Sequence, residues 1–351
     1  MYNLFAENFV VVGKYIYFVA YEMNLLCRFS LQEEKVEILD AIPDQSIKCE
    51  RLVGDVVYWN NQLIFTPLRA EKIWVYHLDE DKWEGIELPE EIGKTEYTSK
   101  GAILCGNILF MPGFGYQGMI IMELDTRKVF GIEFQDERCD KKLDGCFWGN
   151  SYVKKQNSIY LASLQSNIVV KFDMDSYEYE CFAVGEAENR YISIGWDGDK
   201  YWLVPRFNGP YVIWDGESAA QNYTLPSAFL ERDCYFSGIE LMHGKKIMFY
   251  GFQDKTLWVD GEKVDTCFVE NESCYLAKKV KGLGHVRFLK GKIQIIYEDG
   301  TKKDFMCVID THKRDSYIDS KKIIEKYFKE AGEHETQMLD LNYFLEKLIN
   351  D

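Results

Sequence analysis

The feature that most limits the possible fold is a repeat of about 46 residues that runs through most of the chain. Short apolar runs begin directly after a Gly or Asn at seven positions: Gly13, Asn61, Gly106, Asn157, Gly198, Gly244 and Gly291. Self-similarity at a period of roughly 40 to 50 residues indicates a repeat architecture, and blades of β-propellers have this length. The sequence therefore predicts seven structural units.

Within each unit the residues favour strands over helices. In the second unit the segments ERLVGDVVYW, QLIFTPL, KIWVYHLD and WEGIEL follow one another between residues 50 and 88. Such short alternating runs of Val, Ile, Tyr, Phe and Trp, bounded by Gly, Asn and Asp, are typical of strands. Helical repeats of similar length need helices of about a dozen residues, and the units contain no such segment. We predict an all-β domain over residues 1–312, a seven-bladed β-propeller with four strands per blade.

The last unit leaves an alternative open. After the segments IQIIYEDG and KDFMCVID no fourth strand is obvious. Propellers avoid an open sheet edge by closing the ring, and residues 1–5 are candidates to supply the missing strand. A six-bladed ring, with the Gly291 unit acting as a cap, is the alternative to seven blades.

One segment resembles a known repeat family. The stretch VYHLDEDKWEGI (residues 75–86) is similar to the end of a kelch repeat, in which an acidic turn follows the third strand and a Trp, here Trp83, opens the fourth. The resemblance extends as architecture over roughly residues 5–312, although no unit has the double Gly of kelch repeats. It implies kelch-like propeller geometry.

Beyond the repeats the pattern changes to that of helices. Residues 313–351 contain the segments SYIDSKKIIEKYFKEAG and TQMLDLNYFLEKLIND, whose apolar residues recur at helical spacing. We predict a C-terminal helical hairpin that either packs on its own propeller or forms an interface with a second subunit or a partner protein. The residues expected to form this tail interface are Tyr327, Phe328, Leu341, Phe344, Leu345 and Leu348.

Composition excludes several classes of partner. The net charge of -16 makes binding to a phosphate backbone improbable. No stretch of about 18 apolar residues occurs, and the N-terminus lacks the pattern of a secretory signal. The ten cysteines are scattered without a CxxC pair, as expected of reduced thiols. We therefore expect a cytoplasmic protein that binds neither nucleic acid nor membrane.

The candidate binding residues lie in loops. In propellers of this kind, the loops that join strand two to strand three and blade to blade lie at one end of the channel, where functional sites usually lie. In this sequence these loops repeatedly hold aromatic or basic side chains: Arg51, Arg69, Tyr97, Phe114, Tyr116, Phe147, Trp148, Arg190, Tyr191, Arg206, Phe207, Tyr235, Phe236, Phe252 and His285. Two explanations stay open: the rings fill the space between blades, or they form a pocket for a sugar, a peptide segment or an anionic small group.

Enzyme signatures are few. The chain has five histidines and lacks the GxSxG, P-loop and Rossmann patterns in a suitable setting. No clustering of His, Cys and carboxylates predicts a metal, and no cofactor is expected. We expect a non-catalytic scaffold for protein–protein interaction or ligand binding, with the tail as a second contact surface and as a possible site of homo-oligomerisation. The alternative is a carbohydrate-active or lyase-type enzyme with its site at the central channel, which would show convergent polar side chains there, whereas a scaffold would show a broad exposed apolar patch.

Overall fold

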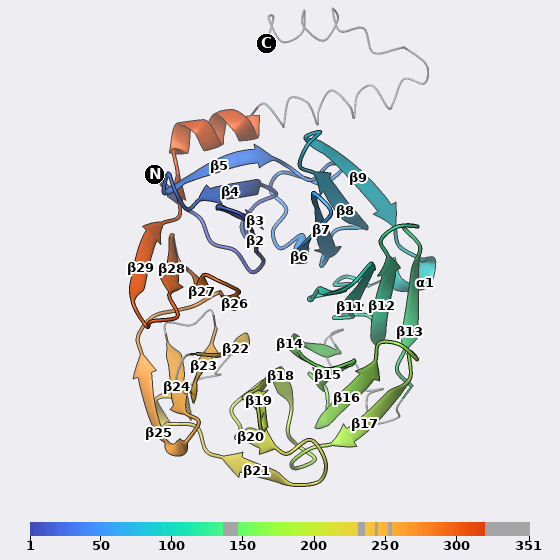
Figure 1. The fold of residues 1–351 in the computed structure, drawn as a ribbon, viewed down its shortest axis with the longest axis vertical. Helices are drawn as coiled ribbons and strands as arrows, with labels where there is room; N and C mark the ends of the chain where they lie inside the picture. The colour runs from blue at the N-terminus through green and yellow to red at the C-terminus, as the bar shows by residue number, and fades with distance from the viewer. Residues whose placement is uncertain (94, 136–146, 231–235, 243–244, 252–254, 320–351) are drawn as a thin grey trace, which may run out of the picture. The chain divides into compact units, whose positions relative to one another are not determined.

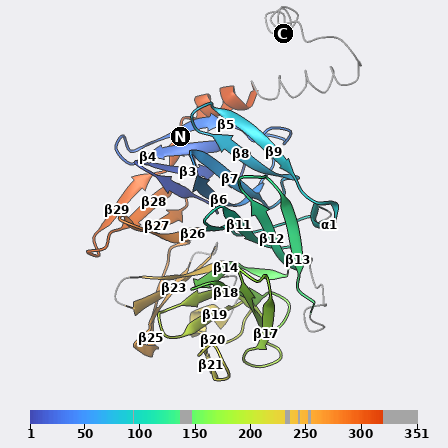
Figure 2. The same cartoon turned by 45° about the vertical axis from the view of Figure 1, so that its right-hand side comes forward.

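Seven four-stranded antiparallel sheets follow one another along the chain and are arranged around a central channel (Figure 1). The structure is a computed structural model and describes residues 1–93, 95–135, 147–230, 236–242, 245–251 and 255–319. It divides into two compact units, Tyr2–Val308 and Met1 with residues 309–351. The first unit is the ring of sheets, and Figure 2 shows these sheets from another side. The all-β, seven-bladed propeller is thus confirmed, and the six-bladed alternative is wrong.

The four strands of each blade are consecutive in the chain and pair in sequence order. Blades 1 to 4 consist of β2 (Val10–Val12), β3 (Tyr15–Val19), β4 (Leu26–Ser30) and β5 (Lys35–Asp40); β6 (Val53–Trp59), β7 (Gln62–Pro67), β8 (Lys72–His77) and β9 (Lys82–Glu87); β10 (Ile103–Cys105), β11 (Ile108–Pro112), β12 (Gly118–Glu123) and β13 (Val129–Glu133); and β14 (Trp148–Lys155), β15 (Ser158–Ser163), β16 (Ile168–Asp173) and β17 (Tyr179–Ala183). Blades 5 to 7 consist of β18 (Tyr191–Trp196), β19 (Tyr201–Pro205), β20 (Tyr211–Trp214) and β21 (Ala220–Tyr223); β22 (Gly238–Leu241), β23 (Lys246–Tyr250), β24 (Thr256–Asp260) and β25 (Lys263–Glu270); and β26 (Leu276–Val280), β27 (Gly284–Leu289), β28 (Lys292–Ile296) and β29 (Lys302–Met306). The first strand of each blade lies next to the channel (Figure 1).

The seventh blade corrects the sequence reading in its strand assignment. Gly291 lies between β27 and β28, the second and third strands, whereas the corresponding turn residues of the earlier blades follow the first strand. The innermost strand is β26, whose sequence LAKKV contains two lysines and therefore lacks a clear apolar pattern. Because β29 completes the sheet from the chain's own sequence, the seventh blade does not borrow a fourth strand from residues 1–5.

The N-terminal segment nevertheless joins the two ends of the ring. The Leu4 amide donates a hydrogen bond to the Cys307 carbonyl (2.9 Å), the Cys307 amide to the Gly291 carbonyl (2.8 Å), and the Gly291 amide to the Leu4 carbonyl (3.2 Å). The short strand β1 (Tyr2–Asn3) pairs with β30 (Val308–Ile309). These bonds satisfy backbone groups that would otherwise be left open where the ring closes.

Large aromatic side chains fill the spaces between adjacent blades. Between blades 3 and 4, Phe110, Phe134, Trp148 and Phe172 are fully buried in one cluster, and Phe134 packs edge-on against Trp148 with ring centroids 5.4 Å apart. Each sheet has neighbours on both faces, so its residues are apolar on both faces. This packing explains the high aromatic content, since each buried ring removes a large apolar area from water.

Glycines allow an innermost strand to approach the backbone of the neighbouring blade closely. A Cβ atom on Gly149 would lie 2.5 Å from the carbonyl oxygen of Ile192, and one on Gly54 would lie 2.2 Å from that of Ser99. Both distances are shorter than a van der Waals contact, so only glycine fits without movement of the neighbouring backbone. The narrow inner circumference of the ring thus depends on these positions.

Helix is scarce among the described residues. Two single-turn helices, α1 (Glu90–Gly93) and α2 (Ser227–Leu230), lie in connections between blades, and residues 311–319 are helical in the second unit. Within the described part of the chain no helix has the length and apolar character needed to cross a membrane. The predicted hairpin from residue 320 onward, including Tyr327, Phe328, Leu341, Phe344, Leu345 and Leu348, lies outside the described residues.

Candidate functional site

The channel contains a cavity of about 720 Å³ lined by residues from all seven blades or the segments leading into them. We call the end where the blade-to-blade connections reach the inner strands the loop end, and the opposite end, where first and second strands are joined, the turn end. Four carboxylates line the cavity: Glu7, Asp55, Asp197 and Glu240. Four lysines line it too: Lys100, Lys154, Lys278 and Lys279. Charged groups therefore face a space that the fold leaves open.

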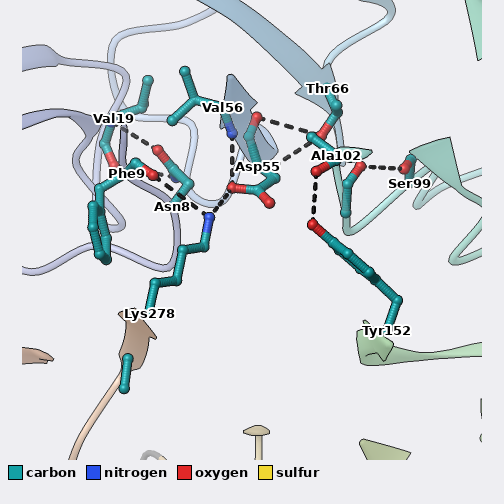
Figure 3. A network of polar contacts seen from close by, with 12 residues as sticks. Asn8, Phe9, Val19, Asp55, Val56, Thr66, Ser99, Ala102, Tyr152 and Lys278 are labelled. Carbon is teal, nitrogen blue, oxygen red and sulfur yellow. Dashed lines mark hydrogen bonds and ion pairs between the residues drawn. The ribbon is translucent and has the colours of Figure 1, made fainter. Parts of the chain in front are cut away.

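An ion pair between blades 7 and 2 crosses one side of the channel. The Lys278 ammonium of β26 lies 2.5 Å from Asp55 Oδ1 of β6 and 3.5 Å from the Phe9 carbonyl oxygen (Figure 3). Asp55 is held in place because its Oδ1 also accepts a bond from the Val56 amide (2.8 Å). The strand of blade 1, β2, contributes no residue to the cavity wall. The open space thus lies toward the inner strands of the other blades.

At the loop end a buried carboxylate binds two cations. Glu7 Oε2 lies 3.2 Å from Arg51 Nε and 3.6 Å from Lys100 Nζ. Aromatic rings stack beside this cluster: Tyr275, which lines the cavity, stacks on Phe5 with centroids 4.1 Å apart, and Phe5 stacks on Tyr21 at 4.9 Å. The loop end of the cavity therefore combines stacked aromatic rings with a carboxylate whose charge is balanced by neighbouring cations.

On the wall between blades 6 and 7, a histidine and a glutamate form a buried pair. His285 Nδ1 lies 3.0 Å from Glu240 Oε1, and both side chains are largely buried. Burial raises the pKa of the Glu240 carboxyl, while the neighbouring His285 and Lys279 act in the opposite direction. Such a pair can exchange a proton, which makes it the described part of the cavity wall best suited to acid–base chemistry.

The wall formed by blades 3 to 6 is held by hydrogen bonds between blades. The Tyr152 hydroxyl donates to the Ala102 carbonyl oxygen (2.9 Å; Figure 3), and burial together with the nearby Asp55 carboxylate raises the pKa of Tyr152. Asn150 Nδ2 donates to the Ser237 carbonyl oxygen (3.0 Å). Because these bonds link different blades, the cavity shape is fixed by the fold and not by a single loop.

Some of the residues predicted as binding residues lie together at the loop end. Arg69 hydrogen-bonds the Tyr97 hydroxyl and lies over the Tyr97 ring, 4.8 Å from its centroid. Tyr97 in turn meets Phe114 edge-on, with centroids 6.1 Å apart. Arg51 is separate from this group and is bound to Glu7 beside the cavity. The cavity lining includes none of the four predicted residues Arg51, Arg69, Tyr97 and Phe114.

Two further predicted residues are bound to backbone carbonyl groups, Arg190 within its own loop and Arg206 at a loop of the preceding blade. Arg190 donates to the Ala187 and Asn189 carbonyl oxygens. Arg206 donates to the Leu164 carbonyl oxygen (2.9 Å) and lies 4.9 Å from the centroid of Phe207, which is exposed. Their guanidinium groups therefore help to fix the loop conformations.

The remaining described aromatics of the prediction serve in packing. Phe147, Trp148, Tyr191 and Phe236 are buried in the clusters between blades, and the Tyr191 hydroxyl donates to the Val184 carbonyl oxygen (2.7 Å). Tyr116 packs against the cluster between blades 2 and 3. These rings therefore fill the space between blades, which is the first of the two explanations offered for the aromatic residues in the sequence analysis. Tyr235 and Phe252 lie outside the described residues.

His285 lies elsewhere than the sequence reading placed it. It was expected at the start of an innermost strand at the loop end, but it lies in β27, the second strand, opposite Lys279 and toward the turn end. The shifted reading of blade 7 explains the error. His285 is buried, and its described polar partner is Glu240.

Sequence reasoning missed the residues that line the cavity. Asp55, Asn150, Glu240 and Lys278 lie on innermost strands, whereas the search was confined to loops. A signal was present for Asp55 and Asn150, which are polar residues within apolar strands, LVGDVVYW and FWGNSYV. The segment around Lys278, LAKKV, gave no such signal. Side chains of an innermost strand are the ones that reach the channel, so polar residues there were the better candidates.

Comparison with known proteins agrees with the fold and goes no further. No family model matches the chain, and no curated protein matches its sequence. Among solved structures, a virginiamycin B lyase from Staphylococcus aureus is similar with a TM-score of 0.62 and 13% identity over 88% of this chain and 98% of that one. YCF48 from Cyanidioschyzon merolae is similar with a TM-score of 0.59 and 10% identity, over 87% of this chain and 95% of that one. PorZ, a surface component of the type-IX secretion system of Porphyromonas gingivalis, is similar with a TM-score of 0.56 and 10% identity, over 88% of this chain and 39% of that one. At these identities the likeness establishes a β-propeller, with no family shown.

Proposed function

We propose that this protein binds a small polar molecule in the cavity of its central channel. The observation that supports this is the convergence of eight charged side chains, together with hydrogen-bonding groups such as Ser151 and Tyr275, on one open space of about 720 Å³. Ligand pockets have volumes of roughly 300 to 1,000 Å³. Several of these charges, such as those of Glu7, Lys100 and Glu240, are largely buried. Burial of charged groups does not favour folding by itself, so their presence is better explained by a ligand.

The exposed surface gives less support to a scaffold that binds proteins through an apolar face. Within the described part of the propeller, the large hydrophobic side chains that are exposed are Tyr58, Phe207, Phe268 and Met306. They are few and lie on different elements: β6, the loop after β19, β25 and β29. Partner surfaces usually show a contiguous apolar area.

A cavity-filling variant tests the proposal. Leu276 lines the cavity on β26, so Leu276→Trp places a larger side chain into the open space. We expect a thermal-shift screen with small polar metabolites to find ligands that stabilise the wild type and not this variant. Phe268→Trp, on the outer strand β25, is the matched control and should respond like the wild type. Ligands that stabilise both variants equally would contradict a site in the channel.

An enzyme of the lyase or carbohydrate-active type is the second candidate, and the His285–Glu240 pair favours it. A carboxyl whose pKa is raised by burial and that lies within hydrogen-bonding distance of an imidazole can act as a general acid or base. With a ligand identified by the screen, Glu240→Gln should abolish conversion while binding persists. If the wild type binds the ligand and leaves it unchanged, the catalytic candidate is wrong for that ligand.

We further propose a cytoplasmic location and kelch-like repeat ancestry. The first is supported by free thiols at all seven described cysteines, Cys27, Cys49, Cys105, Cys181, Cys267, Cys274 and Cys307, and the second by the segment around Trp83. Measuring the redox state of the thiols in the native cell compartment would test the first.

A further inference from the structure

The cavity carboxylates already have partners within the protein. Glu7 binds Arg51 and Lys100, and Asp55 binds Lys278. Asp197 Oδ1 accepts bonds from the Asp199 and Lys200 amides at 2.8 and 2.7 Å, and its Oδ2 accepts one from Trp202 Nε1 at 2.7 Å. Glu240 is bound to His285. A ligand that enters the cavity therefore meets carboxylates that each already have a partner, although Glu7 Oε1 is buried without a hydrogen-bond partner among the described residues.

Two of the four cavity lysines differ in this respect. Lys100 and Lys278 bind the carboxylates named above, but Lys154 and Lys279 form no ion pair with any described residue. The Lys279 backbone amide hydrogen-bonds the Glu240 carboxylate, and the Lys279 ammonium acts on it electrostatically without forming an ion pair. Both side chains are exposed. In a chain of net charge -16, these are two ammonium groups at one cavity that have no carboxylate partner among the described residues, and they are available to bind an anion.

Both lysines lie at the turn end of the cavity. Lys154 is one residue before the end of β14, and Lys279 is one residue before the end of β26. A third cation is near: Lys155 lies 3.8 Å from the ring centroid of Trp196, which lines the cavity at the end of β18. Positive charges gathered around a concave opening attract an anion more strongly than the same charges on a flat surface.

We propose that the turn end of the channel binds the anionic group of the ligand, a carboxylate or a phosphate, through Lys154 and Lys279. This inference rests on the proposed function, because it names the chemical class of ligand for the same cavity. The ligand's remaining polar atoms face Ser151 and Glu240 on the neighbouring inner strands. Each contact of an ammonium with an anion is a charge-assisted hydrogen bond, stronger than a neutral one.

Calorimetric titration of the full chain with inorganic pyrophosphate, at constant ionic strength, tests this proposal. The test variant is Lys154→Gln/Lys279→Gln. The control is Lys263→Gln/Lys302→Gln, which removes the same charge from exposed lysines of the outer strands β25 and β29. We expect the wild type and the control to bind equally and the test variant to bind at least about tenfold more weakly. Equal binding by all three, or absence of pyrophosphate binding to the wild type, would overturn the proposal.

The Leu276→Trp screen separates this inference from the proposed function. If that variant blocks a neutral or cationic ligand while the wild type does not bind pyrophosphate, the anion site is wrong and the cavity function stands. If pyrophosphate binding depends on Lys154 and Lys279 while neither it nor any screened ligand is affected by Leu276→Trp, the two lysines bind anions at the channel opening alone, and the proposal that a ligand occupies the cavity fails.

Discussion

Lys278 and Asp55 are separated by 223 residues in the chain, yet their charged groups lie 2.5 Å apart beside the channel. The pair joins the seventh blade to the second past the inner strand of the first. Contacts between blades 7 and 1, such as that between Phe9 and Phe288, span even more of the sequence because these blades close the ring. The Lys278–Asp55 pair differs in that both residues line the cavity of the candidate site.

Removing Lys278 should destabilise the protein more than removing both members of the pair. Lys278→Met leaves Asp55, which is mostly buried, without its cation, and we expect a loss of about 2 kcal/mol in the free energy of unfolding. In Lys278→Met/Asp55→Asn the loss should be smaller than the sum of the single losses, because no uncompensated charge remains. Urea unfolding of the three variants measures this. Strictly additive losses would show that the pair contributes nothing.

Glu22 should make stability depend on pH. Burial, with the nearby Glu50 carboxylate, raises the pKa of Glu22 to about 7, and its Oε2 is buried without a hydrogen-bond partner among the described residues. Between the ordinary pKa of a glutamate, about 4.3, and about 7, the folded state binds more protons than the unfolded state, so stability falls as pH rises through this window. The cost is complete above pH 7 and absent below about pH 4.

Glu22→Gln should remove this dependence. Because Glu22 is partly open to water, we expect the variant to be more stable than the wild type by only about 1 kcal/mol at pH 8, and equally stable near pH 4.5. Urea unfolding at both values checks the expectation. Glu298→Gln, at an exposed turn, is the control and should show no such crossover. A variant that is less stable at pH 8 would contradict the assignment.

Gly149→Ala should disturb the inner ring. Its added Cβ would lie 2.5 Å from the Ile192 carbonyl oxygen, whereas a Cβ on Gly209 would meet nothing nearer than 3.9 Å. Crowding between backbone segments typically costs about 1 to 3 kcal/mol. We therefore expect Gly149→Ala to lower the midpoint of thermal unfolding clearly and Gly209→Ala to leave it nearly unchanged. Equal effects of the two substitutions would mean that the inner strands have room to separate.

Asn24→Ala should loosen the connection between blades 1 and 2. The fully buried Asn24 side chain donates to the Ile42 and Gln45 carbonyl oxygens and accepts from the Ile42 amide. Its loss leaves buried backbone groups unsatisfied, which costs about 2 to 3 kcal/mol. Hydrogen exchange should show faster exchange at Ile42 in particular, while an amide remote from this loop, such as that of Val212, exchanges at its former rate. Unchanged exchange at Ile42 would refute the role of Asn24.

The sequence was sufficient for the fold because each blade is encoded locally. A turn residue such as Gly13 or Asn157, followed by an alternating apolar run, recurs at nearly constant spacing, and strand pairing within a blade needs only neighbouring segments. The seventh blade was misread where this local signal fails: β26 carries Lys278 and Lys279 among its five residues, and without an apolar pattern the strand was not recognised.

The candidate site was harder to predict because it depends on contacts between remote blades. Nothing near Asp55 in sequence indicates Lys278, and nothing near Glu240 indicates His285. Aromatic residues in the loops recur from blade to blade and gave a stronger pattern than the polar residues of the inner strands. Such rings, Trp148 and Tyr191 among them, recur because the space between each pair of blades must be filled. Polar residues on inner strands were the informative exceptions.

The hydrogen bonds among Leu4, Cys307 and Gly291 also bear on how the protein is made. The N-terminal segment leaves the ribosome first, but its bonding partner at Cys307 is synthesised only after all seven blades. Until then the first blade lacks a neighbour on one side, and its backbone and rings stay open to unwanted association. The ring of blades must therefore close late in biosynthesis. Truncated chains that end before Cys307 should be the forms that depend most on chaperones.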